Sequence, residues 1–207
     1  MLWSGMAITE RRAREHAARR RLIISTARQL AEAEGWEAVT TRRLSEEIEY
    51  SQPVLYKHFS GMDNLAEAVA IDGFGELAEV LAGARRGRRN PKATLKRVAH
   101  AYIDFADKNP SLYDAMFVRA TTLRFAQADT PAELQKGFAE IRQAVSEMAD
   151  RQDADTLAEV LWAALHGLVT LNRAGRLRPG QQSARVDLLI DQFTLTHNRP
   201  SRADTGA

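Results

Sequence analysis

The residues whose types and spacing best fit a chemical role lie between positions 40 and 59, in the sequence TTRRLSEEIEYSQPVLYKHF. Apolar residues at helical spacing alternate there with hydroxyl, amide, ammonium and imidazole side chains, which hydrogen-bond readily to phosphates and base edges. The stretch predicts two short helices joined by a tight turn, the second opening at Ser51 and closing at Phe59. A helix that lies in the major groove of DNA needs this arrangement, because a neighbouring helix must hold its back face.

The charge of the chain is unevenly distributed. The net charge is only +2, but seven arginines and two glutamates lie between Glu10 and Arg28, directly ahead of the helix pair. These arginines are expected either to contact the phosphate backbone of DNA or to reach a minor groove as a flexible arm. A second basic cluster, at 85–89, lies in a glycine-containing segment and is interpreted as a solvated surface.

Composition excludes several classes of protein. The chain has 207 residues and no cysteine, which removes disulfides and thiolate chemistry. No apolar run approaches the ~18 residues that span a bilayer, and the N-terminus lacks the pattern of a signal peptide. A cytoplasmic location without membrane contact is therefore expected.

The sequence also does not indicate catalysis. It has no glycine-rich phosphate-binding loop and no nucleophile motif. His100 and Asp104 are four residues apart and could share a metal ion, but no third ligand lies nearby in the sequence, and pairing at the surface is the simpler interpretation. The prediction is a protein that is not an enzyme, with no cofactor and no metal site.

The whole chain is predicted to be all-α, with about nine helices. The first helix is predicted to start at Thr9 and to end at Gly35. Later helices are predicted to start at Ser60, at Asn90 and Asn109, which both precede a proline, and at Thr130 and Asp153. A last helix is predicted over about 183–197. The first three helices form a small helix-turn-helix domain over 9–60. A larger helical domain covers 61–198, and a polar, disordered tail covers 199–207.

Two parts of the sequence resemble one protein family. Residues 20–65 resemble the DNA-binding domain of the TetR family of bacterial transcriptional regulators. The matching elements are Ala27, Gly35-Trp36, Thr40-Thr41, Val54-Leu55-Tyr56-Lys57-His58-Phe59 and Leu65. Residues 161–168, Leu-Trp-Ala-Ala-Leu-His-Gly-Leu, resemble the Trp-His-Gly signature of one branch of the family's regulatory domain.

The resemblance implies a DNA-binding role for nine residues. They are Thr40, Thr41 and Arg42 at the start of the second helix, and Ser51, Gln52, Pro53, Tyr56, Lys57 and His58 on the recognition helix. Gln52 is the candidate for direct base readout, because its amide can pair with adenine through two hydrogen bonds. Leu55 and Phe59 are expected to be core residues.

The sequence departs from the family pattern at two positions. Glu49 replaces the usual glycine of the turn, which must then either keep a right-handed backbone or accept mild strain. Met62 replaces a lysine that usually meets a phosphate, which predicts a slightly weaker dependence of DNA affinity on salt.

The helix predicted from Asp153 is apolar on two faces, which indicates burial on both. In the family's architecture one face packs inside the subunit and the other against a second subunit, together with the last helix. The dimer-interface candidates are Leu157, Leu161, Leu168, Val186, Leu189, Ile190 and Phe193. The alternative is that both faces belong to the core of a single subunit.

Large, mostly apolar side chains on several predicted helices suit a cavity for a small apolar or aromatic ligand. The candidate lining residues are Tyr102, Phe105, Tyr113, Met116, Phe117, Leu123, Phe125, Trp162 and His166. Simple core packing is the alternative for each of them. For His166 the choice is between a core histidine and a hydrogen-bond partner of the ligand.

The sequence therefore predicts a homodimeric transcriptional repressor that a small ligand releases from a palindromic double-stranded DNA operator. The helix from Ser60 to about Ala84 is the expected lever between the two domains. Two alternatives stay open: a DNA-organising protein without sequence preference, and a helical small-molecule binding protein that keeps the helix pair only for packing.

Overall fold

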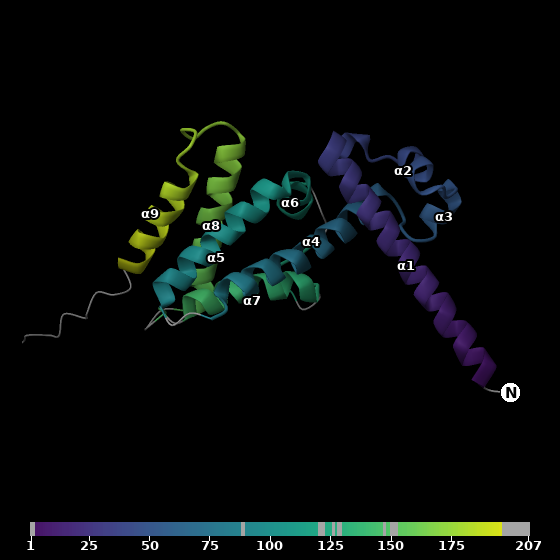
Figure 1. The fold of residues 1–207 in the computed structure, drawn as a ribbon, viewed down its shortest axis with the longest axis horizontal. Helices are drawn as coiled ribbons and strands as arrows, with labels where there is room; N and C mark the ends of the chain where they lie inside the picture. The colour runs from purple at the N-terminus through teal and green to yellow at the C-terminus, as the bar shows by residue number, and fades with distance from the viewer. Residues whose placement is uncertain are drawn as a thin grey trace, which may run out of the picture. The chain divides into compact units, whose positions relative to one another are not determined.

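The computed structural model describes residues 3–87, 90–119, 123–125, 127, 130–146, 148–149 and 153–195. Within these ranges the chain forms nine α-helices, one short 3-10 helix and no strand, which confirms the all-α prediction (Figure 1). The elements are α1 (Trp3–Glu34), η1 (Trp36–Ala38), α2 (Thr41–Ile48), α3 (Gln52–Tyr56), α4 (Met62–Arg85), α5 (Pro91–Lys108), α6 (Pro110–Phe117), α7 (Ala132–Ser146), α8 (Ala154–Arg173) and α9 (Gln182–Leu195). The tail predicted over 199–207 lies outside the described residues.

One predicted helix start, that of α1, is wrong, and the predicted starts of α4 and α7 are each one residue too early. α1 begins at Trp3, so Thr9 lies inside the helix and is not its N-cap. Charged pairs four residues apart, Arg14 with Glu10 at 3.9 Å and Arg11 with Glu15 at 3.5 Å, support the helix directly after Thr9. α7 begins at Ala132, one residue later than a helix with Pro131 in its first position.

The chain divides into two compact units, which are described separately below. The first unit contains residues 1–73 and 109–124, and the second contains 74–108 and 125–207. α4 contributes residues to both, because the boundary falls after Gly73. α6 belongs to the first unit, although α5 directly precedes it in the chain and belongs to the second.

The core of the first unit holds the short helices against α1. Its buried residues include Ile23, Ile24, Ala27, Leu30, Ala31, Val39, Leu44, Ile48, Leu55, Phe59 and Leu65. α2 is capped by Thr40, whose side-chain oxygen accepts a hydrogen bond from the Arg43 amide at 3.2 Å. α3 begins with Pro53 in its first turn, where the missing amide donor carries no penalty.

The turn between α2 and α3 uses a left-handed backbone. Glu49 has φ 55° and ψ 31°, and it is the one non-glycine residue with positive φ among those described. Of the two alternatives predicted for this position, the strained one is therefore observed. The Tyr50 amide donates to the Ser45 carbonyl at 3.2 Å, so the turn closes the C-terminal end of α2.

In the second unit, α5 is the most completely buried helix and packs against α7, α8 and α9. The C-terminal end of α4 is fixed by Arg97, whose Nε and Nη2 both donate to the Ala84 carbonyl, at 2.9 and 2.6 Å. A partly buried ion pair joins Arg85 to Glu140 at 2.8 Å and ties α4 to α7. The C-terminal end of α4 is therefore held by hydrogen bonds to one of its last carbonyl groups and by one ion pair.

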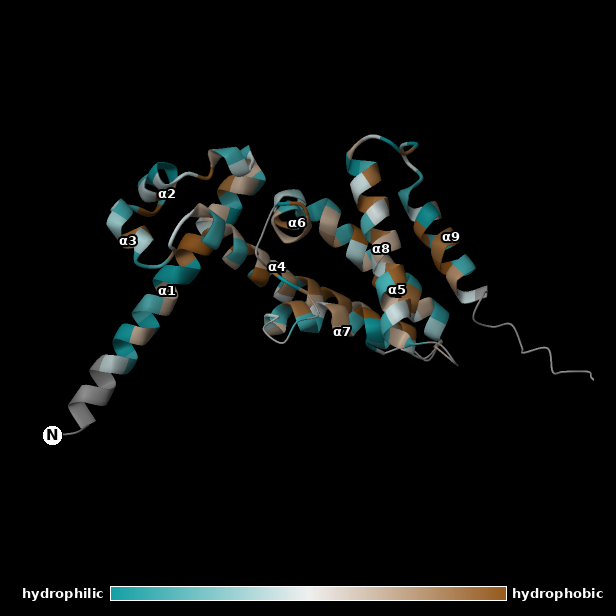
Figure 2. Cartoon of the chain, turned by 180° about the vertical axis from the view of Figure 1, so that it is seen from behind, coloured by the Kyte–Doolittle hydropathy of each residue, from teal (hydrophilic) through white to brown (hydrophobic). Residues whose placement is uncertain are grey.

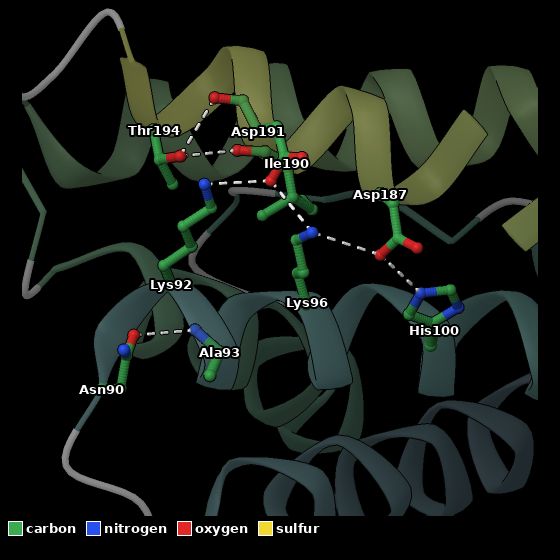
Figure 3. Close-up of polar contacts among 9 residues, drawn as sticks. All are labelled: Asn90, Lys92, Ala93, Lys96, His100, Asp187, Ile190, Asp191 and Thr194. Atoms are coloured by element: carbon green, nitrogen blue, oxygen red, sulfur yellow. Dashed lines mark hydrogen bonds and ion pairs between the residues drawn. The ribbon is translucent and has the colours of Figure 1, made fainter. Parts of the chain in front are cut away.

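A ladder of charges joins α5 to α9 (Figure 3). Lys96 lies 2.9 Å from Asp191 and 3.5 Å from Asp187, Lys92 lies 3.0 Å from Asp191, and His100 lies 3.2 Å from Asp187. The hydrogen bond with His100 lowers the pKa of Asp187, and the hydrogen bond with Asp191 raises the pKa of Lys96. Lys96 and both carboxylates therefore stay charged around neutral pH.

Replacement of Glu49 by glycine is expected to stabilise the protein. A side chain at this left-handed position costs about 1 kcal/mol that glycine does not incur. Glu49→Gly should therefore raise the melting temperature by about 2–4 °C for a chain of this size, measured by circular dichroism.

The matched control is Glu46→Gly, at an exposed position inside α2. Here glycine replaces a good helix former in a right-handed conformation and should lower stability by about 1 kcal/mol. A lower melting temperature for both variants would show that the Glu49 backbone is not strained.

Candidate nucleic-acid interface

The short helix α3 separates its residues into an outer polar face and an inner apolar one. Ser51, Gln52, Pro53 and Lys57 are exposed, and Tyr56 keeps 56% of its surface open. Leu55 and Phe59 are 5% and 4% exposed, as expected for core residues. Burial of the two apolar side chains therefore points the polar ones outward into solvent.

The start of α2 supplies further polar groups. Thr40 is exposed but occupied as the helix cap. The Thr41 hydroxyl donates to the Met62 sulfur at 3.7 Å, so Met62 packs where the family pattern has a lysine. Arg42 is exposed and lies 3.0 Å from Glu46 in an ion pair four residues along the helix. The guanidinium of Arg42 is held at the surface by an exposed and therefore weak pair.

His58 has different surroundings from the other candidates. It is half-buried, its ring centroid lies 4.2 Å from that of His16, and its carbonyl oxygen accepts from Arg20 Nη1 at 3.2 Å. Burial of the ring and, after it, the nearby His16 and Arg20 lower the pKa of His58, so the ring is neutral near pH 7. The sequence analysis did not pair His16 with His58. Its signal was the spacing of His16 and Arg20, which continues the buried stripe of α1 toward the N-terminus.

The first turn of α6 is bound to the end of α1. Pro110 has no amide hydrogen, and the next two amides, of Ser111 and Leu112, donate to the Glu32 carboxylate at 3.1 and 2.9 Å. The Ser111 hydroxyl donates to the Ala31 carbonyl at 2.7 Å. One glutamate thus satisfies the amide donors that a helix N-terminus leaves unpaired.

Two further hydrogen bonds reinforce this junction. Trp36 Nε1 donates to the Ser111 carbonyl at 2.8 Å, and Arg28 Nη2 donates to Asn109 Oδ1 at 2.9 Å. Asn109 occupies the N-cap position of α6, as predicted, but its side chain makes no capping bond to that helix, whereas Asn90 caps α5 through the Ala93 amide. Sequence reasoning missed Glu32, because nothing in the chain marks it as the partner of a helix about 80 residues later.

The predicted ligand-lining residues fall into both units. Tyr113, Met116, Phe117 and Leu123 belong to the first, and Tyr102, Phe105, Phe125, Trp162 and His166 belong to the second. In the second unit, Trp162 Nε1 donates to the Tyr102 hydroxyl at 3.1 Å, and the Phe125 ring lies 5.5 Å from that of Trp162. Phe74 and Phe138 join this aromatic cluster and were not predicted.

The predicted dimer-interface residues also divide into two groups. Leu161, Val186 and Ile190 have no exposed surface, and Leu157 is 8% exposed. These four are core residues of the single chain, because their own subunit covers them completely or almost so. Leu168, Leu189 and Phe193 remain partly exposed.

Some apolar surface of α8 and α9 stays uncovered. Val160, Leu171 and Leu188 are 55%, 41% and 59% exposed, and a side chain at Gly167 would meet no atom within 4 Å.

Among the described residues α8 is the one helix long and apolar enough to cross a membrane by length and composition, with 28% of its most apolar window buried. Core helices of soluble proteins meet this criterion as well.

Among the described residues, no group of three or more His, Asp or Glu side chains could hold a metal ion. His100 lies 3.2 Å from Asp187 of α9 and does not pair with Asp104, so the predicted surface pair of His100 and Asp104 is wrong.

Two helices, α1 and α2, hold the short, polar-faced helix α3 on an apolar core, which is the arrangement of a helix-turn-helix domain. Residues 23–69 match the family model described as "Bacterial regulatory proteins, tetR family", and residues 95–193 match "Tetracyclin repressor-like, C-terminal domain". The two models describe the same family and together match more than half of the chain, so the chain belongs to the TetR family of bacterial regulatory proteins.

Similar proteins carry compatible descriptions. The uncharacterized HTH-type transcriptional regulator YobS of Bacillus subtilis is 31% identical over 48% of this chain and 51% of its own length, so the chain spans about half of that relative. The uncharacterized HTH-type transcriptional regulator Rv0681 of Mycobacterium tuberculosis is 29% identical over 75% of this chain and 71% of its own length. A solved structure of a protein of unknown function from Rhodococcus sp. RHA1 has a TM-score of 0.70 and 25% identity, over 86% of this chain and 94% of that one.

Proposed function

We propose that this regulator is a homodimeric, cytoplasmic repressor without enzymatic activity, which binds a palindromic operator and leaves it when a small ligand binds. The exposed polar face of α3 carries the DNA-binding part of the proposal. Gln52 reads a base edge in the major groove, and Lys57 meets a phosphate. Leu55 and Phe59 are buried behind them and fix their direction.

The remaining contacts surround this pair. Ser51 and Pro53 lie at the start of α3, and Tyr56 and His58 at its end, so they border the same groove. His58 is neutral and can donate one hydrogen bond to a phosphate, but adds no charge. At α2, Thr40, Thr41 and Arg42 flank the adjacent backbone.

The dimer uses the uncovered apolar face of α8 and α9. Val160, Leu168 and Leu171 lie along one side of α8, and Leu188 lies on α9. A soluble protein rarely leaves such a stripe open, and a second copy would cover it in a four-helix arrangement. Gly167 lets another backbone approach closely there, which supports assignment to the Trp-His-Gly branch.

The ligand is small and apolar or aromatic, and binds beside the Tyr102–Trp162–Phe125 cluster. Burial lowers the pKa of His166, so its neutral ring suits an uncharged ligand. Proteins of the same fold have been solved with small molecules: a TetR variant of Acinetobacter baumannii with minocycline (18% identity, TM-score 0.59) and FadR of Bacillus subtilis with stearoyl-CoA (10%, 0.63).

Release follows from the position of α6 in the chain. α6 is hydrogen-bonded to α1 through Glu32, while Lys108 at the end of α5 is only two residues before its start. A ligand that favours one arrangement of α5 therefore acts on α1 through α6, in addition to α4. Operator affinity falls by the ligand's differential affinity for the two arrangements.

Two substitutions on α3 test the DNA-binding part. A mobility-shift titration would use duplex selected by the wild-type protein from a random-sequence library. Gln52→Ala should relax selectivity at one base position, at a cost of about 1–3 kcal/mol. Lys57→Ala should weaken binding to all sequences and reduce the salt slope by about 0.9 in each subunit, or about 1.8 for the dimer.

The control is Lys136→Ala, which removes one exposed cation from α7 and should leave both properties unchanged. Equal losses from Lys57→Ala and Lys136→Ala would favour a DNA-organising protein that binds through its overall charge. No effect of either α3 variant would mean that the helix pair serves only for packing.

Charges placed on the uncovered face test the dimer. Val160→Asp combined with Leu188→Asp should convert a dimer into a folded monomer, measured by light scattering after size-exclusion chromatography, because each carboxylate would be buried unpaired. Val80→Asp, at a similarly exposed valine of α4, is the control and should stay dimeric. A dimer in all three proteins would place the interface elsewhere.

A fluorescent probe tests the ligand site. The aromatic anion 1-anilinonaphthalene-8-sulfonate should bind and accept excitation energy from Trp162, and it should weaken the operator complex. Trp162→Phe should remove most of this transfer, whereas Trp36→Phe, in the first unit, should leave it intact. Transfer that depends on Trp36 alone would contradict a ligand site in the second unit.

A further inference from the structure

The part of α1 that precedes the core has one strongly basic face. Arg12, His16 and Arg19 lie within about 60° of one another around the helix, at spacings of three, four and seven residues. All three are exposed. Figure 2 shows that the described section of α1 that projects past α3 is mostly hydrophilic. This section is therefore a charged surface and not part of the apolar core.

The same face is attached to the end of the recognition helix. The His16 ring lies 4.2 Å from the ring of His58, two residues after the end of α3. One turn further along α1, Arg20 donates to the His58 carbonyl at 3.2 Å and lies 4.3 Å above the Phe59 ring. The basic face thus continues the polar surface that begins at Lys57, and its position relative to α3 is fixed by these contacts.

The charges of α1 differ in how they are neutralised. Arg11 and Arg14 lie at least about 80° around the helix from Arg12 and Arg19, and they pair with Glu15 and Glu10. Glu15 is four residues before Arg19, but its carboxylate pairs with Arg11. In the described part of the chain, Arg12 and Arg19 form no ion pair with a carboxylate. Arg12 and Arg19 therefore carry unpaired positive charge on the side that touches α3, and Arg21 carries another unpaired charge on the opposite side.

We propose that this face of α1 is a second DNA-binding surface, which contacts the phosphate backbone flanking the bases read by α3. Arg12 and Arg19 make the contacts, and the residues around His58 hold them in place. The inference rests on the proposed function, because it needs α3 to lie on DNA. It favours a rigid helix over the flexible minor-groove arm considered from the sequence.

The dimensions fit this partner. Arg12 and Arg19 are two helical turns apart, or ~10.5 Å along the axis of α1. Phosphates on one DNA strand follow at ~3.4 Å along the duplex axis, so two such arginines span about three phosphates. Contacts of this kind carry no sequence information, but they raise affinity and its dependence on salt.

The test compares two double variants that remove the same charge. Arg12→Gln with Arg19→Gln removes the proposed contacts, and Arg11→Gln with Arg14→Gln removes two arginines from other sides of the helix. Each is titrated by fluorescence anisotropy onto the duplex selected by the wild-type protein, either trimmed to the selected site or carrying about one helical turn (~10 bp) of arbitrary sequence on each side.

Arg12→Gln with Arg19→Gln should bind the flanked duplex more weakly, with a salt slope shallower by about 0.9 per lost contact, or about 3.6 for two contacts in each of two subunits. It should bind the trimmed duplex like wild type, and the Arg11 and Arg14 variant should resemble wild type on both. Equal slopes for the two variants on flanked DNA would overturn the proposal.

Two other results also overturn it. One is loss of binding to phosphatidylserine vesicles by the Arg12 and Arg19 variant without any loss on DNA, which would assign the face to a membrane surface. The other is an unchanged advantage of flanked over trimmed duplex in that variant. Failure of the wild-type protein to select any sequence would instead contradict the proposed function, so the two failures are distinguishable.

Discussion

Burial of the back of α3 is the interaction on which the rest of the first unit depends. A helix of five residues is far too short to be stable alone, because the cost of starting a helix is spread over so few hydrogen bonds. Leu55 and Phe59 supply the missing stability by packing into the core formed with α1. Because the same contacts fix the buried side of α3, Gln52 and Lys57 point into solvent. The burial that stabilises the helix therefore also orients its polar side chains.

The junction between α1 and α6 shows how a helix can belong to a unit that its place in the chain does not indicate. Proline at the start of α6 removes one amide donor, and Glu32 accepts from the next two. Because these groups are matched in number and geometry, loss of the glutamate would leave two partly buried donors without partners. The connection is therefore specific, and not only a result of apolar contact.

Much of the fold followed from periodicity and capping residues. Apolar residues at helical spacing and the motif Val54–Phe59 were sufficient to predict the helix pair and the exposure of Gln52, Lys57 and Tyr56. Periodicity identifies an apolar face but not the element that covers it. For this reason Leu161, Val186 and Ile190 were assigned to a dimer interface, although they lie within their own subunit. Contacts between residues far apart in sequence, such as Glu32 with the first turn of α6, have no local signal.

The charge ladder between α5 and α9 has a consequence for how α9 finds its register. Its members repeat every four residues on two antiparallel helices, with Lys92, Lys96 and His100 facing Asp191 and Asp187. Sliding α9 by one turn, ~5.4 Å, would still bring a carboxylate opposite a lysine, so the charges attract the helix without selecting a single alignment. Selection falls to Val186 and Ile190, whose complete burial leaves no room for a slipped arrangement.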